Sequence, residues 1–335
     1  MPLPPEAIER LYSTSAYAQL QRGLTGASNA VPFALFDVAC VAVVLGWIAA
    51  TARDLLRRRT HGGIALLGRL VLRTLVVAAG VYLAFLVLWG LNYRRVPLAT
   101  KLELDPASVS GEAVRQLAED AVAALNALYD EAVSDRTPPV SPIDPRLARA
   151  FLGAQEALGV PRPARPARPK HTLLDPYFRA GAVQGMTAPF FLETLVPSDL
   201  LPVERPAVIA HEWSHLAGFA DEAEAGFVAW LTCLRAPPGA RYSGWLSLYV
   251  EASNALPAAD RDAVRARLGP GPRDDLRAIA ERWRRNVRPA VSSAGWRMYD
   301  RYLRANRVEA GAASYGHVLR LVVGTELGRE ARKGG

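Results

Sequence analysis

Apolar residues are unevenly distributed along this chain, and they are densest in the first hundred positions. One apolar segment runs from Val31 to about Thr51, and a second runs from about Leu75 to Leu91 with further apolar residues upstream. Each is close to the roughly 20 residues that a helix needs to cross a bilayer. The first follows a charged, proline-containing leader, which is unlike the short basic start of a cleaved signal peptide. The pattern predicts two transmembrane helices within residues 31–96, with Asp37 near the end of the first, where it can reach the interface.

Arginine is concentrated between the two spans. The connecting loop, about residues 52–63, contains Arg53 and the run Arg57–Arg59, whereas Arg94 and Arg95 alone follow the second span directly. Under the positive-inside rule this loop faces the cytoplasm. Residues 1–30 and residues 97–335 are therefore expected to be extracytoplasmic, the first as a short segment and the second as a domain.

Helical periodicity dominates that domain. Amphipathic helices are expected over residues 105–130, 221–234, 243–255, 260–268, 273–302 and 312–323. Residues 171–195 instead mix aromatic and β-forming side chains around Gly181–Gly185, which predicts a hairpin or small sheet. Glu193 in this stretch is either a functional acid or a surface charge on an edge strand. The expected fold class is mainly α with a small β-sheet, an α+β domain preceded by two transmembrane helices.

The motif with the clearest chemistry is His211-Glu212-Trp213-Ser214-His215, an HExxH sequence preceded by apolar residues. Residues four apart share one face of a helix, so His211 and His215 can bind one metal ion with Glu212 beside them as general base. The alternative is a helix that carries two solvated histidines by accident. The apolar run before the motif favours a buried helix and a zinc hydrolase.

Catalytic zinc takes three protein ligands and keeps one position open, so a third ligand is required. Gly218 is expected to end the motif helix, and three acids follow it. Glu222 is the preferred third ligand, because it begins the E-x-x-A pattern of glutamate-ligand zincins. Glu224 is the runner-up, although the two point to different faces of a helix. Asp221 occupies the third-ligand position of a metzincin-type spacing.

The expected chemistry is metal-assisted amide hydrolysis. Zn²⁺ acts as a Lewis acid and lowers the pKa of its bound water to about 7, while Glu212 transfers the proton. Tyr315 and His317 are candidate donors to the developing oxyanion. The sheet edge upstream of the motif is the expected site of substrate strand addition.

Charge and cysteine content exclude some classes of function. The net charge of +8 comes from the loop and from scattered arginines, and no basic patch with interleaved aromatics indicates nucleic-acid binding. Cys40 lies in the first span and Cys233 beyond the motif, so neither a disulfide nor a thiolate ligand is expected. The motif helix is not part of a long apolar run, which argues against an intramembrane protease.

Several segments resemble a bacterial family of two-pass membrane proteins of unknown function with predicted zincin character. The resemblance is carried by Leu88–Tyr93, Gly185–Val196, His211–Phe219, Tyr302–Asn306 and Ala313–Gly316. The family's GFxRExEANF-like run maps onto Gly218–Phe227, with Asp221 in place of arginine and Gly226 in place of asparagine. The resemblance implies Glu222 or Glu224 as ligand and a metallopeptidase anchored in the bacterial cytoplasmic membrane, with its catalytic domain extracytoplasmic.

The sequence as a whole predicts a zinc-dependent metallopeptidase that cleaves peptide or protein substrates, including those of the cell envelope. The alternatives are a non-catalytic membrane protein that uses the zinc site for structure or partner binding, and a zinc hydrolase of non-peptide bonds.

Overall fold

A computed structural model describes residues 3–56, 63–136, 141–305 and 318–334 of the chain. The protein is mainly helical, with one small sheet. The amino-terminal half contains α1 (Pro5–Ile8), the π-helix η1 (Glu9–Ala16), α2 (Tyr17–Asn29), α3 (Leu35–Leu56), α4 (Gly63–Leu88), the 3-10 helices η3 (Gly90–Arg94) and η4 (Pro106–Ser108), α5 (Leu98–Lys101), α6 (Gly111–Ser134) and α7 (Pro145–Ala157). The remainder contains β1 (Pro169–Lys170), α8 (Asp175–Gly181), β2 (Met186–Ala188), β3 (Glu193–Leu195), α9 (Arg205–Leu216), α10 (Glu222–Leu234), α11 (Pro238–Ala255), α12 (Ala258–Ala266), α13 (Pro270–Asn286), α14 (Pro289–Ala305), α15 (Val318–Gly324) and α16 (Glu326–Gly334).

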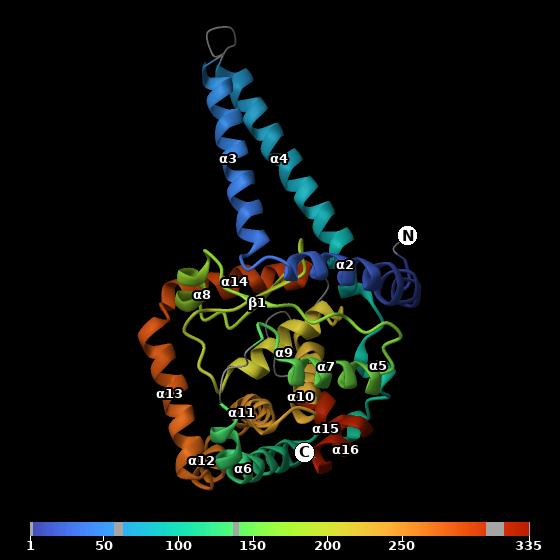
Figure 1. Ribbon diagram of the computed structural model, residues 1–335, viewed down its shortest axis with the longest axis vertical. Coiled ribbons are helices and arrows are strands. Elements are labelled where there is room, and N and C mark those ends of the chain that lie inside the picture. The colour runs from blue at the N-terminus through green and yellow to red at the C-terminus, as the bar shows by residue number, and fades with distance from the viewer. Residues whose placement is uncertain (1–2, 57–62, 137–140, 306–317, 335) are drawn as a thin grey trace.

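Helices α3 and α4 project together from one end of the globular part (Figure 1). Their apolar windows, Leu35–Leu56 and Leu67–Leu88, have mean hydropathies of 2.1 and 2.3, and they are 0% and 6% buried. Exposed helices of this length and composition can cross a bilayer, so the two predicted spans have their counterparts here. Helix α4 ends at Leu88, and the residues that follow form η3 against the globular part.

The core of the globular part is centred on α10. This helix is buried along almost its whole length, because α7, α9, α11 and α15 pack around it. Large aromatic side chains fill the space between these helices, among them Trp213, Phe227 and Trp245, each at most 1% exposed. The result is that the acidic first turn of α10 is held inside the protein next to α9.

The sheet has three short strands in the order β1-β3-β2. Strand β3 pairs in parallel with β1, with Pro169 opposite Thr194, and antiparallel with β2, with Thr187 opposite Thr194. The predicted small sheet is thus present. Glu193, however, is not a surface charge on an edge strand. It lies on the central strand with 0% exposure and forms an ion pair at 2.5 Å with Lys170, whose side chain is equally buried.

Glu193 also fixes the start of α3, the first of the two long apolar helices. Its carboxylate accepts hydrogen bonds from the backbone N–H groups of Leu35 and Phe36 at 3.0 and 2.9 Å, where the helix has no internal partner for them. Asp37, the next residue, accepts from the Thr172 hydroxyl at 2.6 Å. The base of α3 is therefore fastened to the sheet and to the loop that follows it.

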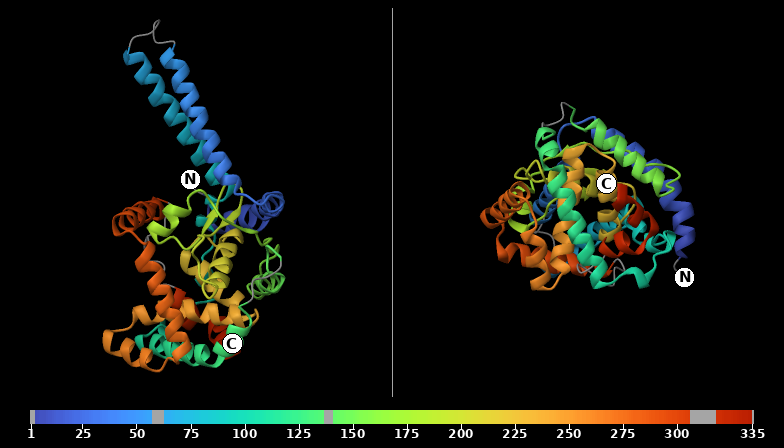
Figure 2. Two further views of the ribbon diagram at one scale, coloured as in Figure 1. Left: turned by 60° about the vertical axis from the view of Figure 1, so that its left-hand side comes forward. Right: turned by 90° about the horizontal axis from the view of Figure 1, so that it is seen from below.

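The sequence predicts residues 1–30 to be a separate short segment, and most of them pack against the globular part. The Tyr17 hydroxyl donates to the Leu216 carbonyl oxygen at 2.9 Å, and Ser28 donates to Glu193 at 3.0 Å. The helices η1 and α2 therefore share a core with residues that follow α4, and Figure 2 shows them lying against the globular part.

The expectation of one helix over residues 273–302 is wrong. Helix α13 ends at Asn286 and α14 begins at Pro289. Proline has no N–H for the helix ladder, and it disfavours helical geometry in the residue before it, so the chain turns at Val287–Arg288. The predicted helix at 312–323 is described from Val318 onward.

Candidate metal centre

The HExxH motif occupies the second half of α9. Pro206 lies in the first turn of this helix, where a missing N–H costs nothing, and the motif side chains begin one and a half turns later. His211 and His215 face the same side, with ring centroids 4.8 Å apart and ring planes at 89°. The predicted helix and the shared face of the two histidines are both present.

A sharp turn brings α10 back against these histidines. Gly218 has a φ of +81°, a conformation that glycine adopts without strain, and it ends α9 as the sequence predicts. Asp221 then caps α10 by accepting from the N–H groups of Ala223 and Glu224 at 2.9 and 3.2 Å. Glu222 becomes the first residue of the helix, and its carboxylate points at the motif.

Three potential ligands meet at this point. Glu222 Oε2 lies 3.0 Å from His211 Nε2 and 3.5 Å from His215 Nε2. One ligand atom from each residue lies within 4.8 Å of the others, and no other group of three such residues comes as close in the described part of the chain. Glu224 faces elsewhere and accepts from the Leu98 N–H at 2.5 Å. Asp221 is used as the cap.

The ring of His215 is held in one orientation. Its Nδ1 lies 2.8 Å from the Phe219 carbonyl oxygen, which can only accept, so Nδ1 donates and Nε2 is the atom presented to Glu222. The indole of Trp89 stacks edge-on against this ring and donates to the His215 carbonyl oxygen at 3.1 Å. Burial by itself lowers the pKa of His215, but the Glu222 carboxylate outweighs it and raises that pKa to about 9.

The donor set fits zinc. Two imidazole nitrogens and a carboxylate are typical catalytic ligands, and tetrahedral bonds of 2.0–2.2 Å separate donor atoms by roughly 3.4 Å. The observed contacts of Glu222 with the two histidines, 3.0 and 3.5 Å, bracket that spacing. Glu222 is 5% exposed, so this carboxylate has little water to solvate its charge and relies on the histidines.

Glu212 stands beside the cluster, and residues of the sheet contact it. The Thr187 hydroxyl on β2 lies 3.0 Å from Glu212 Oε2 and 2.8 Å from the Glu212 carbonyl oxygen. Gly185, just before β2, is so near that an added Cβ would lie 2.5 Å from Glu212 Oε1. Burial raises the pKa of Glu212, the direction that suits proton exchange near neutral pH.

Sequence reasoning did not single out Thr187 and Gly185. Both fall in the segment Gly185–Val196 that carries the family resemblance, which was the available signal. The two candidate oxyanion donors, Tyr315 and His317, lie outside the described residues.

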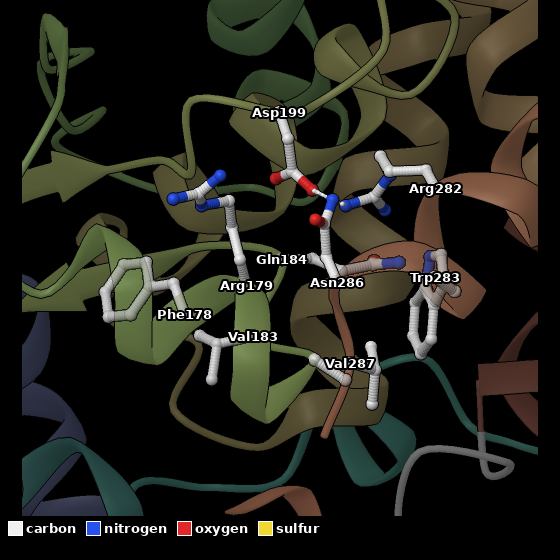
Figure 3. Close-up of a pocket in the computed structure, with 10 residues that line it drawn as sticks. Phe178, Arg179, Val183, Gln184, Asp199, Arg282, Trp283, Asn286 and Val287 are labelled. Atoms are coloured by element: carbon white, nitrogen blue, oxygen red, sulfur yellow. Dashed lines mark hydrogen bonds and ion pairs between the residues drawn. The ribbon is translucent and has the colours of Figure 1, made fainter. Parts of the chain in front are cut away.

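A separate small pocket, partly open to solvent, lies between α8 and α13 (Figure 3). Arg282 and Asn286 contact Asp199 on its wall, at 3.4 and 2.6 Å. None of the three ligand candidates lines it. The pocket is therefore distinct from the candidate metal centre.

Comparison with known proteins identifies a family. The model of a family described as "Protein of unknown function (DUF3810)" matches residues 12–323, so the chain belongs to that family. Searches of curated proteins and of solved structures give no match.

Proposed function

We propose that this member of the DUF3810 family is a membrane-anchored, zinc-dependent metallopeptidase. The observation that carries the proposal is the convergence of His211, His215 and Glu222 around one point, with Glu212 next to it. The zincin-like character of the domain is part of this proposal. So is its extracytoplasmic location, which rests on the arginines of the loop between α3 and α4.

Each residue has a defined task in this mechanism. His211, His215 and Glu222 would hold the ion, and Phe219 orients one of the imidazoles through its carbonyl oxygen. When bound, zinc would supply Lewis-acid chemistry at this site. Glu212 accepts the proton of the nucleophile and returns it to the leaving amine, while Thr187 keeps its carboxylate in place.

Strand β2 offers a place for a peptide substrate. It is an edge strand of the described sheet, and its middle residue, Thr187, contacts Glu212 directly. An extended peptide that added to this edge would pass beside the general base. This geometry favours a peptide or protein substrate over a small non-peptide ester. The membrane helices favour substrates of the cell envelope.

The decisive experiment combines metal content with cleavage. Full-length protein in detergent is assayed for bound zinc as wild type, Glu222→Ala, Glu224→Ala and Asp221→Ala. About one zinc per chain, lost in Glu222→Ala alone, is expected. Loss in Glu224→Ala or Asp221→Ala instead would reassign the ligand, and no zinc in a folded wild type would overturn the proposal.

Cleavage is followed by mass spectrometry on a mixed peptide library, with Glu212→Gln as the matched variant. This change keeps the shape and hydrogen bonding of the side chain but removes its basic character. Zinc retained with cleavage abolished would support an enzyme. Folded, zinc-loaded wild type that cleaves nothing would favour the non-catalytic alternative.

A further inference from the structure

Two helices of the globular part lie beside the base of the membrane helices. Figures 1 and 2 place α8 and α14 at the end of the globular part from which α3 and α4 project, whereas α6 and α12 lie at the opposite end. Helices α8 and α14 pack on each other, and a Cβ on Gly295 of α14 would lie 3.1 Å from the Tyr177 hydroxyl of α8.

Large apolar side chains are exposed on these elements and on the turn before α3. We call them the juxtamembrane patch: Phe33, Leu173, Leu174, Tyr177, Trp296 and Met298, with exposures of 53, 72, 36, 44, 39 and 72%. Side chains of this size at such exposures leave a large apolar area in water, which soluble surfaces avoid unless a partner covers it.

Direct contacts connect the patch to the start of the first membrane helix. The Leu173 N–H donates to Asp37 at 2.8 Å, so this leucine lies against the first turn of α3. Phe33 lies two residues before the start of that helix at Leu35. Tyr177 on α8 lies against Gly295 of α14, the residue before Trp296, so the two helices that carry the rest of the patch lie together at the end of the globular part from which α3 projects.

We propose that the juxtamembrane patch docks on the bilayer surface, so that the globular part lies on the membrane rather than standing away from it. Tryptophan and tyrosine beside aliphatic side chains are the residues that proteins place at the headgroup level. Two arginines of α14, Arg297 and Arg301, are exposed and can pair with lipid phosphates. The partner is thus a lipid surface with anionic headgroups.

Docking of this kind depends on membrane anchoring by α3 and α4, which is part of the proposed function, but not on zinc or on catalysis. It would hold the metal centre at a fixed height above the bilayer, because β3 connects the base of α3 to the strand that contacts Glu212. Substrates near the membrane surface would then be favoured.

The test uses full-length protein in nanodiscs of phosphatidylcholine and phosphatidylglycerol. A fluorescent label is placed at Met298→Cys, or at the control Val133→Cys, where Val133 is 43% exposed. The control lies on α6, a helix at the end of the globular part opposite α3 and α4. Both variants are made in a Cys40→Ala background, because Cys40 is exposed and would also be labelled. Cys233 is buried and is left unchanged. Wild type labelled at Cys40 reports on the membrane helix itself.

Lipids carrying a nitroxide near the headgroup are expected to quench the label at 298 several-fold more than the label at 133, with the reverse order for aqueous iodide. Equal quenching of the two labels would overturn the proposal. Protection of the label at 298 from both quenchers would also overturn it and would assign the patch to a protein partner. If lipid fails to quench Cys40, anchoring itself fails. Quenching at Cys40 without quenching at 298 rejects docking and leaves the anchored enzyme intact.

Discussion

Gly185 and Glu212 are in such close contact that no side chain fits between them: a Cβ at position 185 would lie 2.5 Å from Glu212 Oε1. The backbone before β2 therefore packs directly against the carboxylate of the proposed general base. Glycine is required here by the approach of a carboxylate and not by a special φ angle.

The first prediction follows from this contact. Gly185→Ala should displace the Glu212 carboxylate by about 1 Å and reduce peptide cleavage about 100-fold, the effect of such a displacement on a catalytic group. Zinc content should be unchanged. Gly181→Ala is the control, because its added Cβ meets its nearest neighbour, Val183, at an ordinary 3.7 Å. Equal activity in the two variants would contradict the assignment of Glu212 as base.

Thr187 gives a second prediction. Thr187→Val keeps the shape of the side chain but removes the hydroxyl that donates to Glu212. A hydrogen bond to a charged group contributes roughly 1.5–3 kcal/mol, so kcat should fall about 10–100-fold. KM should change little, since Thr187 acts through Glu212. Thr187→Ser restores the donor and should recover most of kcat; failure of serine to do so would point to a packing role.

The buried ion pair between Lys170 and Glu193 gives a third. Lys170→Met leaves the Glu193 carboxylate without its cation in a site with 0% exposure and should cost about 3–5 kcal/mol of unfolding free energy. Arg146→Met is the control, because the pair of Arg146 with Asp135 is 47% and 22% exposed and contributes at most about 1 kcal/mol. Denaturant unfolding of both variants measures the difference, and similar losses would contradict this account.

Glu9 gives a pH prediction. Burial by itself raises the pKa of Glu9, but Arg95, which contacts both carboxylate oxygens at 2.9 and 3.0 Å, and Lys101 outweigh it and hold that pKa below its ordinary value. A lowered folded-state pKa contributes stability that is present above the unfolded-state pKa and is lost as the pH falls through the folded-state value.

Glu9→Gln should therefore lower Tm by a few degrees at neutral pH, and the difference from wild type should shrink in acid. Glu6→Gln, a change at an exposed carboxylate of the neighbouring helix, should leave Tm unchanged. A difference for Glu9→Gln that is constant from neutral to acid pH would show that its carboxylate charge is not responsible.

Local patterns determined much of this protein. The spacing within HExxH put both histidines on one helical face, Gly218 and Asp221 set the end of α9 and the start of α10, and two apolar runs gave the helices that can span a membrane. These features depend on neighbours within a few residues, so sequence is sufficient for them. The break between α13 and α14 before Pro289 is local as well, and the effect of proline on the preceding residue is sufficient to predict it.

Long-range packing decided the rest. Glu222 rather than Glu224 faces the two histidines because of the turn at Gly218 and the rotation of α10 about its axis within the core. The positions of the two acids in the sequence do not specify either the turn or the rotation. Glu193 can be buried because it accepts hydrogen bonds from Ser28 and Leu35, which are 165 and 158 residues away in the chain. Thr187 contacts Glu212 only because the sheet packs against α9. A sequence defines the chemistry that each side chain can perform, whereas the close packing of distant segments decides which side chains meet.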